Sequence, residues 1–151
     1  MQGQQDQRTI LHLFTEIAIV EHLLRNRYDR SSPAGMTTGQ FGILTHFIRN
    51  DKAEERLSVL AWAFQDSDDY MAEKVASLVQ RGLLSTRPAD GSAGDLIVAI
   101  TESGRAAHAE ALDEISPEIV PLLDGISMDD LKTSLRVVQE IRRTLDNLPD
   151  R

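Results

Sequence analysis

Residues 60–84 constrain the fold of this chain more than any other segment. Apolar residues recur there at helical spacing in two blocks, which a short polar stretch, Gln65–Asp69, separates. The second block ends at Gly82, and glycine is the preferred residue just past the end of a helix. The pattern therefore predicts a short helix, a tight turn and a longer helix, which is the arrangement of a helix-turn-helix.

Two further helices are expected before this motif. Between residues 8 and 30, apolar side chains recur at steps of three and four, which predicts an amphipathic helix. Ser31–Gly35 contains proline and glycine and should end that helix. Thr37 and Gln40 have the form of a capping box, so a second helix is expected to begin there. We interpret Asn50–Glu55 as a polar connection.

A hairpin is expected directly after the motif. Ser85–Arg87 and Leu96–Ile100 read as two short strands, because turn-forming residues flank each run. Pro88–Asp95 is rich in glycine, aspartate and serine and should connect them as a flexible loop. A small hairpin beside a helix-turn-helix is typical of a winged helix.

The C-terminal third predicts two more helices. Thr101 can cap the first, and Pro117 and Pro121 are expected to break or kink it. Ser127 can cap the second, whose apolar residues follow one face as far as Leu148.

The predicted fold is mainly α-helical with a small β-hairpin wing, in a single domain over residues 1–151. Residues 36–104 form the winged helix-turn-helix core in this interpretation. The segments 8–30 and 105–148 are dimerisation helices, because their apolar stripes lack sufficient core within one subunit. The alternative is that these terminal helices pack on each other within one chain.

Composition restricts the cellular location and the chemistry that we expect of this protein. No run of apolar residues is long enough to span a membrane, and the N-terminus lacks the pattern of a secretory signal, so we expect a cytoplasmic protein. Cysteine is absent, which excludes disulfides and thiolate chemistry.

The net charge is −8, and residues 31–105 carry seven bases against ten acids. A DNA-binding segment is normally basic, because phosphate contacts supply most of the affinity.

In its order of motifs the chain resembles the MarR family of bacterial winged helix-turn-helix transcriptional regulators. The residues that carry the resemblance are Met36-Thr37, Gln40-Phe41, Ile43-Leu44, Leu60-Ala61, Phe64, Val75, Leu78-Val79, Arg81 to Leu84, Arg87-Pro88, Ile100 to Glu102, Gly104 and Ile126 to Leu131. The resemblance implies a homodimer that binds double-stranded DNA at a pseudo-palindromic operator. It also implies release by a small, frequently aromatic effector.

The resemblance implies a DNA-contacting surface on the second helix of the motif and on the wing. Its expected members are Ser67, Tyr70, Glu73, Lys74, Ser77, Arg81 and Arg87. We expect the outward face of the helix to carry Tyr70, Ala72, Glu73, Ala76 and Ser77, with Lys74 lying along the core and only its amine exposed.

This surface departs from the family pattern in three ways. Asp66, Asp68 and Asp69 surround the start of the helix, where they cap it well but repel a phosphate. Glu73 stands where an arginine is common in the family, and it cannot hold phosphate or guanine. The wing, residues 89–95, contains no base. A second interpretation is therefore a MarR-derived dimer that has lost DNA binding and acts through a small ligand or a protein partner.

The family's effector pocket lies between the dimer helices and the winged core. The side chains that could face such a pocket are His22, Tyr28, Met36, His46, Phe47, Arg49 and Trp62, although each can equally be ordinary packing. The four histidines never stand at the four-residue spacing of a helical metal pair, so no metal or other cofactor is expected. No nucleophile motif, phosphate-binding loop or carboxylate pair indicates an enzyme.

Overall fold

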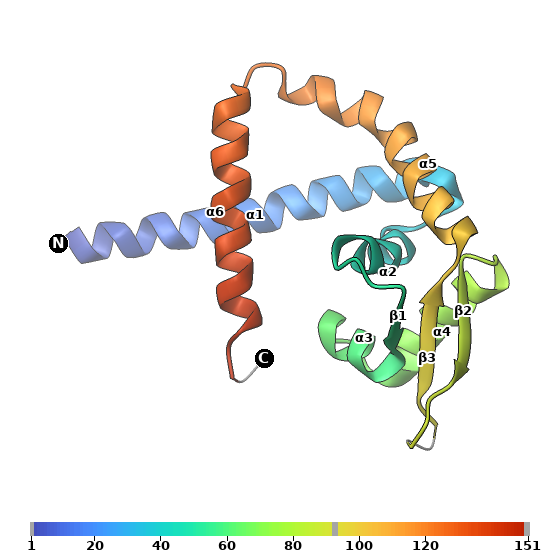
Figure 1. The fold of residues 1–151 in the computed structure, drawn as a ribbon. Coiled ribbons are helices and arrows are strands. Elements are labelled where there is room, and N and C mark those ends of the chain that lie inside the picture. The colour runs from blue at the N-terminus through green and yellow to red at the C-terminus, as the bar shows by residue number, and fades with distance from the viewer. Residues whose placement is uncertain (1, 92–93, 150–151) are drawn as a thin grey trace. The chain divides into compact units, whose positions relative to one another are not determined.

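The computed structural model describes residues 2–91 and 94–149, and Figure 1 shows its elements along the chain. Ser92 and Ala93 of the predicted wing loop lie outside the described residues, as do Met1, Asp150 and Arg151. The elements are α1 (Gln2–Ser31), the 3₁₀ helix η1 (Pro33–Gly35), α2 (Thr38–Arg49), β1 (Glu54–Arg56), α3 (Leu57–Phe64), α4 (Asp68–Gln80), β2 (Leu84–Pro88), β3 (Leu96–Ile100), α5 (Glu102–Ile119), η2 (Val120–Leu123) and α6 (Met128–Asp146).

The chain divides into two compact units, Met1–Ile115 and Ser116–Arg151. The first contains α1 to β3 and most of α5, and it includes the helix-turn-helix. The second contains the end of α5, η2 and α6. The mainly helical fold with a small antiparallel sheet confirms the predicted class. The single domain over residues 1–151 stays a prediction.

Side-chain caps fix where the helices of the first unit begin. Thr37 and Gln40 form the predicted capping box, since the Thr37 hydroxyl accepts from the Gln40 N–H and the Gln40 side chain accepts from the Thr37 N–H. The Ser67 hydroxyl accepts from the Tyr70 N–H and caps α4. The Thr101 hydroxyl accepts from the Gly104 N–H in the same way at the start of α5.

The helix-turn-helix consists of α3, a turn and α4. The turn closes because Gln65 adopts a left-handed conformation, with φ of 54°. Gly82 ends the second helix with φ of 74°, and the Leu83 N–H then reaches back to the Leu78 carbonyl. This is the glycine-terminated helix end that the sequence predicted.

A three-stranded antiparallel sheet in the order β1-β3-β2 forms the wing and its base (Figure 1). β2 and β3 pair from Leu84 opposite Ile100 to Pro88 opposite Leu96, which confirms the predicted hairpin. The sequence prediction was wrong at β1, because Glu54–Arg56 pairs with β3 where a polar connection was expected. Pairing through the backbone lets charged side chains lie on an edge strand.

The core of the first unit lies between α2, α3, α4 and the sheet. Its largest fully buried side chains come from all of these elements: Phe47, Met36, Ile43, Leu44, Leu60, Met71, Leu78, Leu84, Val75 and Val98. Each such side chain stabilises the fold by about 1.5–3 kcal/mol through its removal from water. This core holds the buried side of α4 and leaves its other side to solvent.

Three helix boundaries differ from the prediction. α1 begins at Gln2, six residues earlier than residue 8. α5 continues through Pro117 without a break and ends at Ile119, just before Pro121, the second predicted breaker. Proline removes one backbone donor, and within the last turn of an exposed helix the carbonyl that loses its partner can bind water. α6 begins after its predicted Ser127 cap and ends at Asp146, two residues before Leu148.

Candidate nucleic-acid interface

The exposed outer side of α4 carries carboxylates and no cation. Met71, Val75 and Leu78 are buried and define the inner side of the helix. Asp69, Glu73, Ala76 and Gln80, spaced by four, three and four residues, form the opposite side, and all four are exposed. The outermost ridge of the helix therefore presents two negative charges to any polyanion that approaches it.

The predicted outward face was wrong at two positions. Ala72 is half-buried and lines an apolar cleft that α4 forms with Leu57, Thr86 and Leu96. Ser77 is also half-buried, and its hydroxyl accepts from the Gln40 side chain and donates to the Lys74 carbonyl. Its hydrogen-bonding capacity is thus used within the subunit.

Lys74 forms an ion pair with Asp66, which lies just before the start of α4. Its ammonium lies 2.8 Å from the Asp66 carboxylate, and both side chains are largely buried. The same ammonium stands 4.3 Å from the centroid of the Tyr70 ring, at cation–π distance. Lys74 was expected to lie along the core with only its amine exposed. The side chain is half-buried, and its ammonium is already paired with Asp66.

The two arginines predicted to contact DNA also have partners in the chain. The Arg81 guanidinium donates to the carbonyls of Ala34 and Gly35, at 2.8 and 3.2 Å, and ties the end of α4 to η1. The Arg87 guanidinium lies 3.0 Å from the Glu54 carboxylate across the sheet, where both side chains are exposed. Since an exposed pair contributes only about 0.2–1 kcal/mol, Arg87 is the easier of the two to release.

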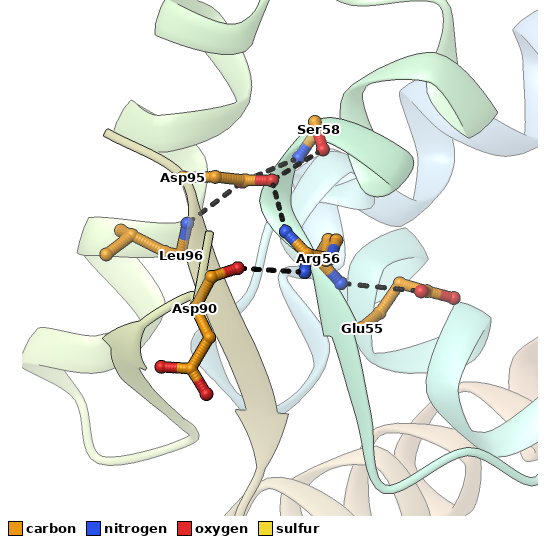
Figure 2. Close-up of polar contacts among 6 residues, drawn as sticks. All are labelled: Glu55, Arg56, Ser58, Asp90, Asp95 and Leu96. Carbon is orange, nitrogen blue, oxygen red and sulfur yellow. Dashed lines mark hydrogen bonds and ion pairs between the residues drawn. The ribbon is translucent and has the colours of Figure 1, made fainter. Parts of the chain in front are cut away.

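The wing is fixed to the start of α3 through Asp95, as Figure 2 shows. The Asp95 carboxylate accepts from the Ser58 hydroxyl at 2.8 Å, from the Ser58 N–H at 3.3 Å and from Arg56 at 3.4 Å. Arg56 also donates to the carbonyl of Asp90. The Ser58 hydroxyl bond, followed by the Leu96 and Ser58 backbone bonds, lowers the pKa of Asp95. Arg56 thus places a cation beside the wing, whose residues 89–95 contain no base. This cation is already paired with the Asp95 carboxylate.

The residues predicted to line an effector pocket lie in different surroundings, although the His46 and Phe47 rings contact each other. Met36 and Phe47 are completely buried in the core. His22, Arg49 and Trp62 are exposed on three different helices. Their role in ligand binding stays a prediction.

His46 and Tyr28, the other two predicted pocket residues, lie partly buried. The Nε2 atom of His46 is buried, lies 3.9 Å from Glu55 and has no hydrogen bond to any residue that the structure describes. Burial lowers the pKa of this imidazole. The Tyr28 hydroxyl is buried likewise, and burial, assisted by the negative charge of Glu114, raises its pKa to about 12.

A polar cluster that the sequence did not reveal surrounds His108 on α5. The imidazole stacks on Phe41, with ring centroids 4.7 Å apart, and bonds the Thr45 hydroxyl at 3.1 Å. Burial lowers the pKa of His108. Tyr28 packs against the same Phe41 ring at 5.1 Å. The helical spacing placed His108 on α5, but only the packing of α2 on α5 brings these groups together.

The part of the chain that the structure describes contains neither a metal site nor a helix that could span a membrane. No three histidine, aspartate or glutamate side chains there converge as a metal site requires. None of its helices combines the length and the apolarity that crossing a bilayer would demand.

The helix-turn-helix and the three-stranded sheet beside it define a winged helix-turn-helix protein. No protein-family model matches the sequence, and no curated protein matches it. Solved structures do share its fold. AbfR of Staphylococcus epidermidis matches with a TM-score of 0.73 at 17% identity, over 95% of this chain and 95% of its own.

Two further solved structures match in the same way. AbsC, a MarR family transcriptional regulator from Streptomyces coelicolor, has a TM-score of 0.66 at 17% identity over 93% of this chain and 96% of its own. An organohalide-sensing transcriptional regulator bound to 2,4-dichlorophenol has a TM-score of 0.67 at 14% identity over 90% and 80%. The chain therefore has the fold of the MarR family of transcriptional regulators, which confirms the fold implied by the resemblance.

Proposed function

We propose that this chain is a homodimeric transcriptional regulator of the MarR type that binds double-stranded DNA weakly. The observation that carries this proposal is that both helices and the turn of the helix-turn-helix are present, with the second helix exposed on one side. α4 is capped by Ser67, ends at Gly82 and is held by the core on one side, with its other side exposed. In proteins of this architecture the helix in that position enters the major groove.

Unpartnered apolar side chains on the terminal helices support the homodimer. On α1 the exposed large apolar residues are Ile10, Leu11, Leu13, Phe14, Ile19, Val20, Leu23 and Leu24. On α6 and the segment before it they are Val120, Leu122, Leu123, Ile126, Met128, Leu135, Val138 and Leu145. Large apolar side chains exposed along a helix in such numbers mark an interface, and a two-fold symmetric dimer is the commonest way to cover it.

The weak binding follows from the charge pairs around α4. Between Leu57 and Arg87 the sequence has three cations, and each contacts an acid or a carbonyl of its own subunit. Phosphate contacts by these cations would require breaking those interactions. Two exposed carboxylates on the outer ridge of α4 would oppose the same approach by roughly 1 kcal/mol each at the protein surface.

The same observation favours a second candidate function. A dimer that keeps the fold but no longer binds DNA would act through a small ligand or a protein partner. In that case the ion pairs of Lys74 and Arg87 persist while the protein functions. DNA does not break these pairs to bind the two cations.

A titration against the DNA upstream of its own gene separates the two candidates. The protein would be titrated at about 50 mM salt, where phosphate contacts are strongest, with an unrelated duplex of equal length as the control. Saturable binding that prefers the upstream duplex supports the regulator. Absence of saturable binding at this salt contradicts it and leaves the second candidate. Light scattering on the same sample checks the dimer, and a monomeric mass would contradict both.

A further inference from the structure

An open groove of about 700 Å³ lies between the second half of α1, the first turns of α2 and one side of α4. We call it the α1–α4 groove. Its lining residues are Glu21, Arg25, Asp29, Thr37, Thr38, Gly39, Gln40, Gly42, Phe64, Tyr70, Glu73, Lys74 and Ser77. All of them belong to the first unit, and none of the seven residues predicted for an effector pocket is among them.

Two aromatic side chains and two glycines shape the groove. Phe64 and Tyr70 contribute ring surface, and the Tyr70 side chain is 53% exposed. A side chain at Gly42 would contact the Phe64 ring, and one at Gly39 would approach the Lys74 methylenes. The lack of a side chain at both positions leaves room beside the rings, enough for a small molecule with an apolar body.

The charges that line the groove favour a cation. Arg25 is neutralised by Glu21 at 2.8 Å, and Lys74 by Asp66 at the same distance. The remaining two charged groups, Asp29 and Glu73, are both carboxylates.

These two carboxylates remain available to a ligand. One oxygen of Asp29 accepts from the N–H and the hydroxyl of Thr38, at 2.7 and 2.6 Å, and these hydrogen bonds lower the pKa of Asp29, so it stays ionised. Glu73 is exposed and makes no hydrogen bond or ion pair with any described residue.

Tyr70 already holds a cation in this groove. The ammonium of Lys74 stands over its ring at 4.3 Å, which is the geometry by which aromatic rings bind ammonium groups. The groove thus combines ring surface that attracts cations with two carboxylates. Arg25 acts on Asp29 at longer range, whereas Glu73 has no positive partner among the described residues.

We propose that the α1–α4 groove binds a small organic cation, an ammonium group on an aromatic or alkyl body. The apolar body lies against Phe64 and Tyr70, and the ammonium group faces Glu73 and Asp29. A phenolate or carboxylate of the same size meets the same ring surface but is repelled by those two carboxylates. This inference does not depend on DNA binding, so it stands or fails separately from the proposed function.

The test compares two probes of equal size and opposite charge, 2-phenylethylammonium and phenylacetate. Each is titrated into the intact protein at low salt, and backbone amide shifts are followed by NMR. We expect saturable binding of the ammonium probe, with shifts concentrated at Thr37 to Gln40 and Tyr70 to Ser77, and phenylacetate at least tenfold weaker. Equal affinity for the two probes, shifts concentrated elsewhere, or no saturation with the ammonium probe would overturn the proposal.

A matched pair of variants tests the role of Glu73. Glu73→Gln keeps the shape of the side chain and removes its charge, so ammonium binding should weaken about two- to fivefold, within the range of an exposed ion pair. Glu110→Gln makes the same change on the exposed side of α5, away from the groove, and should leave the affinity unchanged. Equal affinities for the two variants would show that Glu73 does not hold the cation.

Discussion

Removing the charge of Asp66 should release Lys74 and strengthen DNA binding. In the structure the Asp66 carboxylate is 2.8 Å from the Lys74 ammonium, and the two side chains are 19% and 23% exposed. Asp66→Asn keeps the size of the side chain but removes the attraction. A partly exposed pair of this kind contributes up to about 1 kcal/mol to stability, so the variant should remain folded.

The size of the effect follows from the number of phosphates that the dimer can neutralise. One additional cation in each subunit steepens the dependence of log K on log salt by about 1.8, since each phosphate contact contributes about 0.9. Between about 50 and 200 mM salt this corresponds to an additional loss of affinity of about twelvefold. At the lower salt, removing one repulsive carboxylate per subunit, at about 1 kcal/mol each, should increase affinity by about tenfold to thirtyfold.

Fluorescence anisotropy with one labelled duplex, measured across this salt range for both proteins, provides the assay. Asp113→Asn is the matched control, because it makes the same charge change at an exposed position on α5. The control should bind like the wild type. If Asp66→Asn and Asp113→Asn give the same affinity and salt slope, then Asp66 does not restrain a cation that could reach DNA.

Three further predictions concern stability and the wing. Gly104→Ala should destabilise the first unit by about 1–3 kcal/mol in a thermal melt, because the added carbon would collide with the Leu83 carbonyl. Gly3→Ala is the control and should not destabilise, because open space surrounds Gly3. Equal melting temperatures for the two variants would contradict this packing of Gly104. Burial lowers the pKa of His108 from 6.5, so the unfolded chain binds this proton first and stability should fall as pH drops below about 6.5. His108→Gln should therefore show a smaller loss of melting temperature between about pH 7.5 and 5.5, and an undiminished loss would refute a buried neutral imidazole. Asp95→Ala should free the wing and speed hydrogen exchange of the Ala89 N–H, which bonds the Asp95 carbonyl; unchanged exchange would mean that Asp95 does not hold the wing.

The local features of the fold could be predicted from the sequence because their causes are local. The Thr37–Gln40 capping box, the Ser67 cap and Gly82 act within a few residues, and the structure confirms each of them. β1 could not be predicted in this way. Glu54–Arg56 has no apolar alternation, and it becomes a strand only because β3, more than forty residues away, offers backbone partners.

The electrostatic state of the candidate interface was only partly predictable. The acids at the start of α4 and the lack of a base in the wing are visible in the sequence. The pairing of Lys74 with Asp66, eight residues away, is not a helical spacing, because Asp66 precedes the helix. The hydrogen bonds from Arg81 to the carbonyls of Ala34 and Gly35 depend on the packing of η1 against the end of α4. The sequence shows which charges exist, and the fold decides which of them remain available for a ligand.

The cations near α4, which are Lys74, Arg81 and Arg87, already have partners within the subunit. The most direct measurement is the slope of log K against log salt for the wild-type protein on its own upstream duplex. A dimer that makes fewer than about three phosphate contacts should give a slope shallower than about −3. A slope of about −5 or steeper would mean that these cations leave Asp66 and Glu54 to bind phosphate, and the account would be contradicted.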